Sequence, residues 1–236
     1  MRRAGSILKG ILLAFESALR PGVTTLELDQ LAEGMIRRAG AVPSFKGYLG
    51  FPRSICASVN DEVVHGIPSP NRRIRDGDVV SLDVGCIWQG WHADCARTYA
   101  VGEVAKPVRD LIDATRLAME AGTAAAIAGN RVGDIGAAIE AVAAERGYGL
   151  VRAFVGHGIG TAMHEEPQVP NHGRAGNGLR LEAGMCLAIE PMFTLGGDAV
   201  HVEDDGWTVR TADGTLAAHF ENTIAVGISA AEVLTA

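Results

Sequence analysis

The chain has 236 residues, 47% of them hydrophobic and 21% charged, a composition typical of a globular protein with room for one large core or two small domains. Its net charge of −7 argues against unaided binding to nucleic acids or anionic membranes, and the apolar run at residues 11–15 is too short to span a bilayer. Four scattered cysteines without a CxxC pair argue against a disulfide framework or a thiolate zinc site. Together with a start that does not resemble a signal peptide, they predict a cytoplasmic protein.

Two helices are expected at the start of the chain. Apolar residues at helical spacing predict the first over residues 4–19. The second is predicted to begin at Thr24 or Thr25, where a threonine can cap the first turn, and to end at Gly40. Glycine and proline make the following stretch, 45–65, irregular to extended.

A β-hairpin is predicted next, with strands at about 79–88 and 91–101 joined by Gln89-Gly90. A two-residue turn would put Asp83 and Asp94 on one face as diagonal neighbours, because side chains alternate between faces along a strand. Two carboxylates that close repel each other unless a cation lies between them. The pair is therefore either one edge of a metal site or two solvated acids on an exposed face.

The second half is expected to contain two more helices and a series of short strands. The helices are predicted from Val108 to about Ala128 and from Asp134 to Gly147. Strand-like runs separated by glycine-rich loops follow near 151–155, 185–190, 199–202, 207–211 and 216–226.

The second half also repeats the order of the first. Residues 23–45 align without gaps on 132–154, and the strand-like run 76–83 matches 183–190, each ending in a carboxylate. Identity between the segments is low, so chance similarity is the alternative. A true repeat would be a duplicated helix-plus-hairpin unit whose halves face each other across one shared site. Because no linker divides the chain, we expect a single domain, 1–236, with halves at about 1–105 and 106–236.

Three further residues are of types that bind metal ions. Glu190 and Glu221 are acids inside apolar runs, where an ionised group is costly unless it is paired or bound to a metal. Taken singly, each could be a salt-bridged strand end. His157 stands between glycines in VGHGIG, which allow close approach of a ligand and leave the imidazole accessible.

Together these residues form a set of four carboxylates and one imidazole: Asp83, Asp94, His157, Glu190 and Glu221. Four carboxylates in one cavity cannot all stay ionised without cations, so the set predicts two divalent ions, with Mn, Fe, Co or Zn suiting its oxygen-rich donors. Two such ions can lower the pKa of a shared water and polarise a carbonyl, the chemistry of amide or phosphoester hydrolysis. The lack of a phosphate loop or basic cluster favours the amide.

Six stretches carry a resemblance to a known family: SVNDEVVHGIP (58–68), LDVGCIWQGWHAD (82–94), GHGIGTAMHEEPQV (156–169), IEPM (189–192), DGWTV (205–209) and HFENT (219–223). They resemble the type I methionine aminopeptidases, and the resemblance covers nearly the whole chain. It implies an α+β pita-bread fold, in which pseudo-twofold helix-plus-hairpin halves surround an antiparallel sheet.

By that resemblance the five ligands take separate roles. Asp83 would chelate one ion through both oxygens, and Asp94 and Glu221 would bridge the two ions. His157 and Glu190 would complete the shell of the second ion. Glu190 would also act as the general base, taking a proton from the attacking water and passing it to the leaving amine.

Two histidines outside that set match the substrate-contacting histidines of the family. His65 would assist the leaving nitrogen, and His164 would donate to the scissile carbonyl. Without the resemblance, either histidine could be purely structural. An apolar methionine pocket would be lined by Phe45, Tyr48, Phe51, Cys56, Met163 and Trp207. Met163, Phe45 and Val64, the residue before His65, depart from the common family pattern, which affects the expected pocket size rather than the reaction.

The resemblance implies removal of the initiator methionine from peptides and nascent chains whose second residue is small. It implies substrates presented near the ribosome, and we expect a monomer with no direct nucleic-acid or membrane contact. Three alternatives remain. An Xaa-Pro aminopeptidase or prolidase would usually carry an added domain, a type II enzyme would need an insert where only 26 positions separate His164 from Glu190, and a non-catalytic binding module should lack some ligands.

Overall fold

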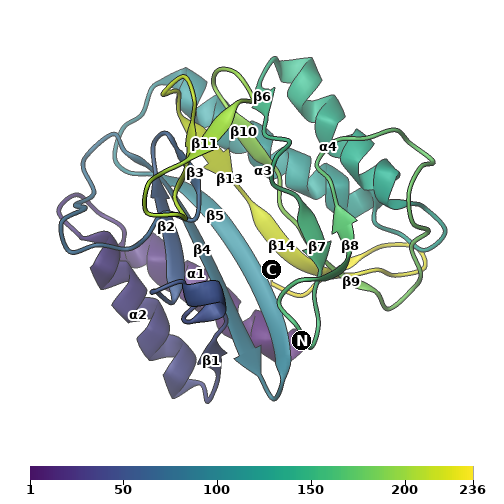
Figure 1. The fold of residues 1–236 in the computed structure, drawn as a ribbon, viewed down its shortest axis with the longest axis horizontal. Helices are drawn as coiled ribbons and strands as arrows, with labels where there is room; N and C mark the ends of the chain where they lie inside the picture. Colours follow the sequence, from purple (N-terminus) through teal and green to yellow (C-terminus); the bar gives the residue numbers. More distant parts are fainter. Residues whose placement is uncertain (236) are drawn as a thin grey trace.

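The computed structural model describes residues 1–235, in which four α-helices and fifteen strands form an α+β fold (Figure 1). Nine strands form one antiparallel sheet, whose path runs β1 (Val42–Pro43), β4 (Val79–Trp88), β5 (Trp91–Ala100), β14 (Glu221–Ala225), β9 (Cys186–Ile189), β7 (Gly156–Gly158) and β8 (Glu165–Val169), with β2 (Ile55–Val59) on β4 and β15 (Glu232–Val233) on β14. Two smaller sheets consist of β13 (Ala217–His219), β10 (Met192–Thr194) and β6 (Gly149–Leu150), and of β11 (Val200–Val202), β12 (Val209–Thr211) and β3 (Glu62–Val64).

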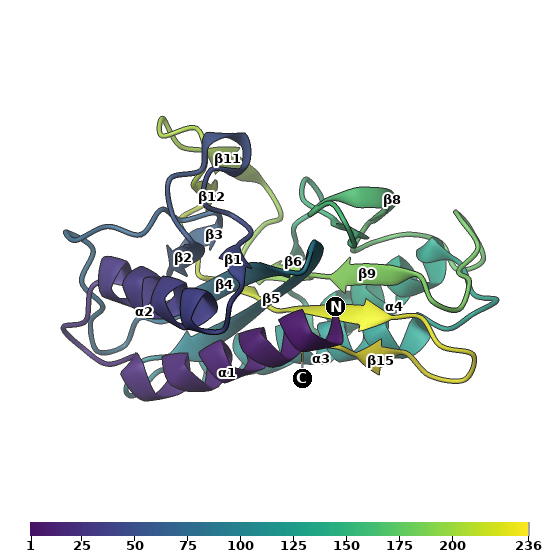
Figure 2. The same cartoon turned by 90° about the horizontal axis from the view of Figure 1, so that it is seen from below.

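The helices bury the apolar side of the sheet in two clusters. Helices α1 (Arg2–Ala18) and α2 (Thr25–Arg38) pack with the first hairpin, and α3 (Lys106–Ala125) and α4 (Val132–Arg146) pack with β9 and β14. Figure 2 shows α1 and α3 beneath the same face of the sheet. The opposite face of the central strands is therefore free to carry polar side chains.

The beginning of α2 shows why the sequence folds locally as predicted. The Thr24 hydroxyl accepts a hydrogen bond from the Glu27 amide at 3.2 Å, and the Glu27 carboxylate accepts from the Thr24 amide at 2.7 Å. This reciprocal pair satisfies two amides that the first turn leaves without helical partners. The residue that caps the helix is Thr24, one of the two that the sequence allowed.

The predicted central hairpin is confirmed in position and register. Strands β4 and β5 are joined at Gln89-Gly90, and Asp83 lies opposite Ala96. The pseudo-twofold arrangement is also confirmed: α1, α2 and the β4–β5 pair in the first half correspond to α3, α4 and the β9–β14 pair in the second. The innermost strands of the two units, β5 and β14, join at the centre of the sheet.

Two strand predictions in the second half are wrong. No strand covers 151–155, because β6 ends at Leu150 and the following residues pack without a ladder until β7 begins. The run 216–226 is divided at Phe220, because β13 pairs with β10 in a small sheet whereas β14 joins the main one. A change of sheet leaves no mark on the alternation of apolar residues. In the second half, the strands β6, β7, β8, β10 and β15 were not predicted.

The helix α4 begins at Val132, two residues before its predicted start, and α3 spans Lys106–Ala125. The Asp134 carboxylate accepts a hydrogen bond from the Arg131 amide at 2.7 Å, so it stabilises the first turn from inside the helix. Among the described residues, no helix is both long enough and apolar enough to cross a membrane.

Candidate active site

The sheet register brings the five predicted ligands to one face. Asp83 on β4 and Glu221 on β14 both lie opposite Ala96 of β5, so they flank it on either side. Asp94 lies two residues from Ala96 on β5 and therefore points to the same face, diagonal to both. The small Ala96 side chain leaves the space between the three carboxylates open.

The second half of the chain supplies the other two residues in the same way. Ala188 on β9 lies opposite both His157 of β7 and Thr223 of β14. Glu190 follows β9 two residues after Ala188, so it lies beside Glu221 and diagonal to His157. The His157 Nε2 and a Glu190 carboxylate oxygen are 3.5 Å apart. The structure therefore brings all five residues together, from strands up to 138 positions apart in the chain.

Several buried carboxylate oxygens of this group have no hydrogen-bond donor in the protein part that the structure describes. One oxygen each of Asp83, Asp94 and Glu221 is inaccessible to solvent and accepts no hydrogen bond from the described residues. Such atoms are costly unless a cation or donor meets them. Ligand atoms of Asp94, His157 and Glu221 lie within 4.8 Å of one another. The donors present fit a divalent cation, for which carboxylate and imidazole are ordinary ligands.

Burial and mutual repulsion raise the pKa of these acids in the metal-free protein. Desolvation and the nearby Asp94 charge raise the pKa of Asp83, Glu190 and Glu221 well above its usual range. Desolvation raises the pKa of Asp94 to about 6. A bound cation favours the ionised form of each acid, so cation binding would expel protons from the site.

His157 has the tautomer that a metal ligand needs. Its Nδ1 lies 2.9 Å from the Gly158 carbonyl oxygen, which can only accept, so Nδ1 carries the proton. The Nε2 lone pair then points toward Glu190. Desolvation lowers the pKa of His157 to about 4, which keeps the ring neutral near pH 7.

His65 is held in the cavity wall by an unusual backbone conformation. Its φ of 61° lies in the left-handed region, which costs a non-glycine residue free energy. A Cβ on the next residue, Gly66, would lie 2.5 Å from the Ala57 carbonyl oxygen, so only glycine permits this approach to β2. The imidazole packs edge-on against Phe154 at 5.6 Å and Trp207 at 6.3 Å between ring centroids. Desolvation lowers the pKa of His65 to about 4.

His164 lies at the mouth of the cavity, within reach of the carboxylate floor. Its ring centroid is 4.2 Å from that of His157, and its Nδ1 is 2.7 Å from the Tyr48 hydroxyl oxygen. Partial desolvation lowers the pKa of His164. The Tyr48 contact fixes the ring so that its other nitrogen is available to a ligand.

A cavity of about 220 Å³ joins these groups. It is lined by the four carboxylates and one imidazole of the floor, by His65 and His164, and by all six residues of the predicted pocket: Phe45, Tyr48, Phe51, Cys56, Met163 and Trp207. Cys56 lies opposite Asp83, so the apolar pocket continues the row of ligands outward. Gly85 makes room for Phe45, whose ring carbon would lie 2.8 Å from a Cβ there.

Leu49 also lines the cavity and was not predicted. It lies in a single 3₁₀ turn, Tyr48–Gly50, with a φ of 48°, and its side chain is 80% exposed at the mouth. An exposed leucine between a tyrosine and a glycine carries no sequence signal of its own, because single exposed apolar residues are common on protein surfaces.

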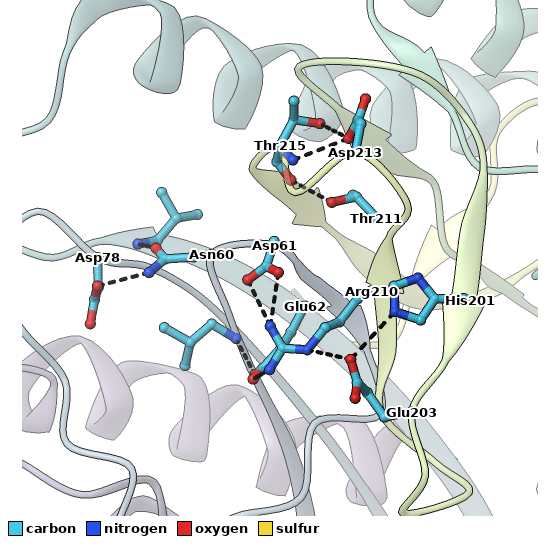
Figure 3. Close-up of polar contacts among 12 residues, drawn as sticks. Asn60, Asp61, Glu62, Asp78, His201, Glu203, Arg210, Thr211, Asp213 and Thr215 are labelled. Atoms are coloured by element: carbon cyan, nitrogen blue, oxygen red, sulfur yellow. Dashed lines mark hydrogen bonds and ion pairs between the residues drawn. The ribbon is translucent and has the colours of Figure 1, made fainter.

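Arg210 links the two segments that carry His65 and Trp207. Figure 3 shows its guanidinium among Asp61, Glu62 and Glu203, at 2.8, 2.7 and 2.9 Å. The cluster ties β12 to β3, the strand that leads into His65. Because each guanidinium nitrogen pairs with a different carboxylate, this network orders its partners more than a single exposed ion pair does.

Replacing Arg210 with methionine is expected to raise the KM for a substrate bound in this cavity about tenfold, or about 1.4 kcal/mol of binding free energy, because the His65 and Trp207 walls would no longer be fixed together. Steady-state kinetics would measure this, with Arg152→Met, which removes an ion-paired arginine outside the cavity, as control. An unchanged KM in the Arg210 variant would show that the cluster does not shape the pocket.

The fold and the cavity floor define a metallopeptidase: the chain belongs to metallopeptidase family M24, whose sequence pattern matches residues 1–227. Within it, the chain falls among the methionine aminopeptidases. It is 50% identical over 235 residues to the methionine aminopeptidase of Clostridium acetobutylicum, covering 100% of this chain and 94% of that protein. The predicted family and the pita-bread fold are thereby confirmed.

Solved structures agree with this placement. The methionine aminopeptidase of Thermotoga maritima superposes with a TM-score of 0.98 at 40% identity, covering 100% of this chain and 94% of that one. An Xaa-Pro dipeptidase of Bacillus anthracis superposes with a TM-score of 0.80 at 27% identity, but this chain spans only 59% of it. The Xaa-Pro enzyme is the more distant relative, and it is longer.

Proposed function

We propose that the chain is a methionyl aminopeptidase, which hydrolyses the first peptide bond of substrates that begin with methionine. Four carboxylates and one imidazole on the floor of an apolar cavity carry this proposal. The cavity walls consist mainly of aromatic and sulfur-containing side chains, which suit an unbranched thioether. Relatives that are 50% and 48% identical to the whole chain, and of which the alignment covers 94%, are methionine aminopeptidases.

Two divalent ions are proposed as cofactors, with Co, Mn, Fe or Zn as candidates. Asp83 would hold one ion, Asp94 and Glu221 would be shared between both, and His157 and Glu190 would hold the second. When bound, such ions polarise a carbonyl and acidify a water. The three unpartnered carboxylate oxygens support this assignment, because no donor among residues 1–235 competes for them.

The residues around the ions would orient the substrate and move its protons. Glu190 would take a proton from the attacking water and pass it to the leaving amine, since its carboxylate lies beside both Glu221 and His157. His164 would donate to the scissile carbonyl from the mouth of the cavity, with Tyr48 fixing its ring. His65 would contact the substrate and assist the leaving nitrogen from the cavity wall.

Replacing His65 with alanine is expected to lower kcat about 10²-fold while leaving metal affinity within twofold of the unmodified protein, because His65 contacts substrate and no metal in this assignment. Steady-state peptide assays would measure kcat, and calorimetric titration with Mn(II) would measure the metal affinity. His172→Ala, a half-buried histidine outside the cavity lining, is the control. Loss of metal binding in the His65 variant would count against its assigned role.

Substrate preference tests the proposed function directly. With Mn(II) or Co(II), we expect release of free methionine from Met-Gly-Met-Met and no cleavage of an Xaa-Pro peptide. Cleavage only before proline would establish the Xaa-Pro activity instead, and no cleavage with any metal would favour a binding module.

We further propose the setting in which this activity operates. Residues 1–236 would act as a single catalytic domain and a monomer in the cytoplasm, on nascent chains whose second residue is small and which emerge near the ribosome. The net charge of −7 is consistent with a protein that meets these substrates without binding nucleic acid or membrane itself.

A further inference from the structure

The two halves of the candidate metal site meet at a short seam. Asp83 and Asp94 come from the first hairpin, whereas Glu221, Glu190 and His157 come from the second half of the chain. The only paired residues between β5 and β14 in the described chain are Ala96 with Glu221 and Cys95 with Asn222. Two residue pairs alone hold two strands together weakly. Other interactions must therefore help to fix the distance between the ligands of the first half and those of the second.

Arg97 reaches across this seam on the face of the sheet that lies against the helices. Its Nη1 donates to the Glu221 carbonyl oxygen at 2.6 Å and to the Ala96 carbonyl oxygen at 2.8 Å. Its Nη2 donates to the Asn222 side-chain oxygen at 2.7 Å. A single guanidinium thus holds the backbone of a ligand from the second half against the strand of the first.

The C-terminal tail extends the same network. The Thr235 hydroxyl donates to the Asn222 side-chain oxygen at 3.1 Å and accepts from the Thr223 amide at 3.2 Å. The Leu234 amide also donates to the Thr223 carbonyl, at 2.9 Å. The tail therefore fixes the residues that follow Glu221 on β14.

Thr223 carries the network through the sheet to Asp94. Its hydroxyl accepts from the Asp94 amide and donates to the Asp94 carbonyl, both at 2.8 Å. Thr223 is fully buried. A continuous chain of hydrogen bonds thus links Arg97 to Asn222, Thr235 and Thr223. This chain fixes the backbone of Asp94 from the first half and of Glu221 from the second.

We propose that Arg97 is a positioning residue for the metal site, which sets the spacing between the ligands of the two halves and so the affinity for divalent cations. This inference rests on the proposed function for the identity of the ligands. Partners behind metal ligands typically contribute 10- to 100-fold to affinity. The planar fork of arginine serves three acceptors at fixed angles, which a lysine ammonium cannot reproduce.

The test is calorimetric titration of chelator-stripped, full-length protein with Mn(II), together with the thermal midpoint of the metal-free form. We expect Arg97→Met to weaken Mn(II) binding 10- to 100-fold and Arg97→Lys to weaken it at least fivefold. Arg116→Met removes an exposed, ion-paired arginine on α3 and should match the unmodified protein. At saturating Mn(II), kcat of the Arg97 variants should return to within a few-fold of normal.

Two results would overturn the proposal. Unchanged Mn(II) affinity in Arg97→Met, even with a lower thermal midpoint, would make Arg97 merely structural. Full affinity in Arg97→Lys would mean that positive charge alone matters and that the fork does not position the ligands. If Arg97→Met fails to fold, Arg97→Lys and Thr235→Val, which removes the hydroxyl between Asn222 and Thr223, decide the question, and normal affinity in both overturns the proposal. If the unmodified protein releases no methionine, the proposed function is refuted, whereas the Mn(II) titrations still decide whether Arg97 positions the ligands.

Discussion

Replacing Glu190 with glutamine is expected to lower kcat for Met-Gly-Met-Met by about 10²–10⁴-fold, the range that a positioned general base contributes. Glutamine keeps the size of the side chain but can neither accept the proton of the attacking water nor pass one to the leaving amine. Glu190 has no hydrogen-bond partner for its side chain among the described residues other than the contact with His157, so the fold should be preserved. Steady-state rates at saturating Mn(II) would measure the effect.

The control is Glu182→Gln, an exposed acid shortly before β9, which should leave the rate unchanged. Circular dichroism of both variants would check the fold. A near-normal rate for the Glu190 variant, measured with metal bound, would remove Glu190 from the mechanism.

Removing the metal ions is expected to abolish activity and to make the free energy of unfolding fall as pH rises. In the metal-free protein, burial raises the pKa of Asp94 to about 6 from a usual value of 3.8, and the pKa of Asp83, Glu190 and Glu221 moves in the same direction. The folded chain then binds more protons than the unfolded one, so stability is lost with increasing pH. For Asp94 the loss falls between about pH 4 and pH 6, and the other three acids extend it upward.

With Mn(II) bound, the trend should reverse, because protons compete with the cation for the same oxygens and metal affinity rises with pH. Urea unfolding at pH 5, 6, 7 and 8, with chelator or with excess Mn(II), would compare the two forms. Parallel pH profiles would contradict the presence of a metal site among these carboxylates.

The sequence predicted the central hairpin because its turn, register and alternating faces are local properties. Gln89-Gly90 fixes the pairing, and the pairing puts Asp83 and Asp94 on one face. Convergence of Glu190, Glu221 and His157 on the same face is not local, and it was predicted from the weak internal repeat and from the family resemblance. The register of β9 and β14 explains it physically.

Other features depend on contacts that no local pattern records. The division at Phe220 arises because neighbouring strands choose different sheets. The Arg97 network joins residues more than a hundred positions apart, and the exposure of Leu49 at the cavity mouth depends on a left-handed turn. Neither Arg97 nor Leu49 lies in a sequence pattern that indicates these contacts.

The central claim is that side chains from both halves of the molecule hold two divalent ions in one cavity. Anomalous scattering from crystals grown with Mn(II), recorded at the manganese edge, tests it most directly. We predict two peaks on the cavity floor, within coordination distance of Asp83, Asp94, His157, Glu190 and Glu221. Peaks elsewhere on the molecule, with none among these five residues, would contradict it.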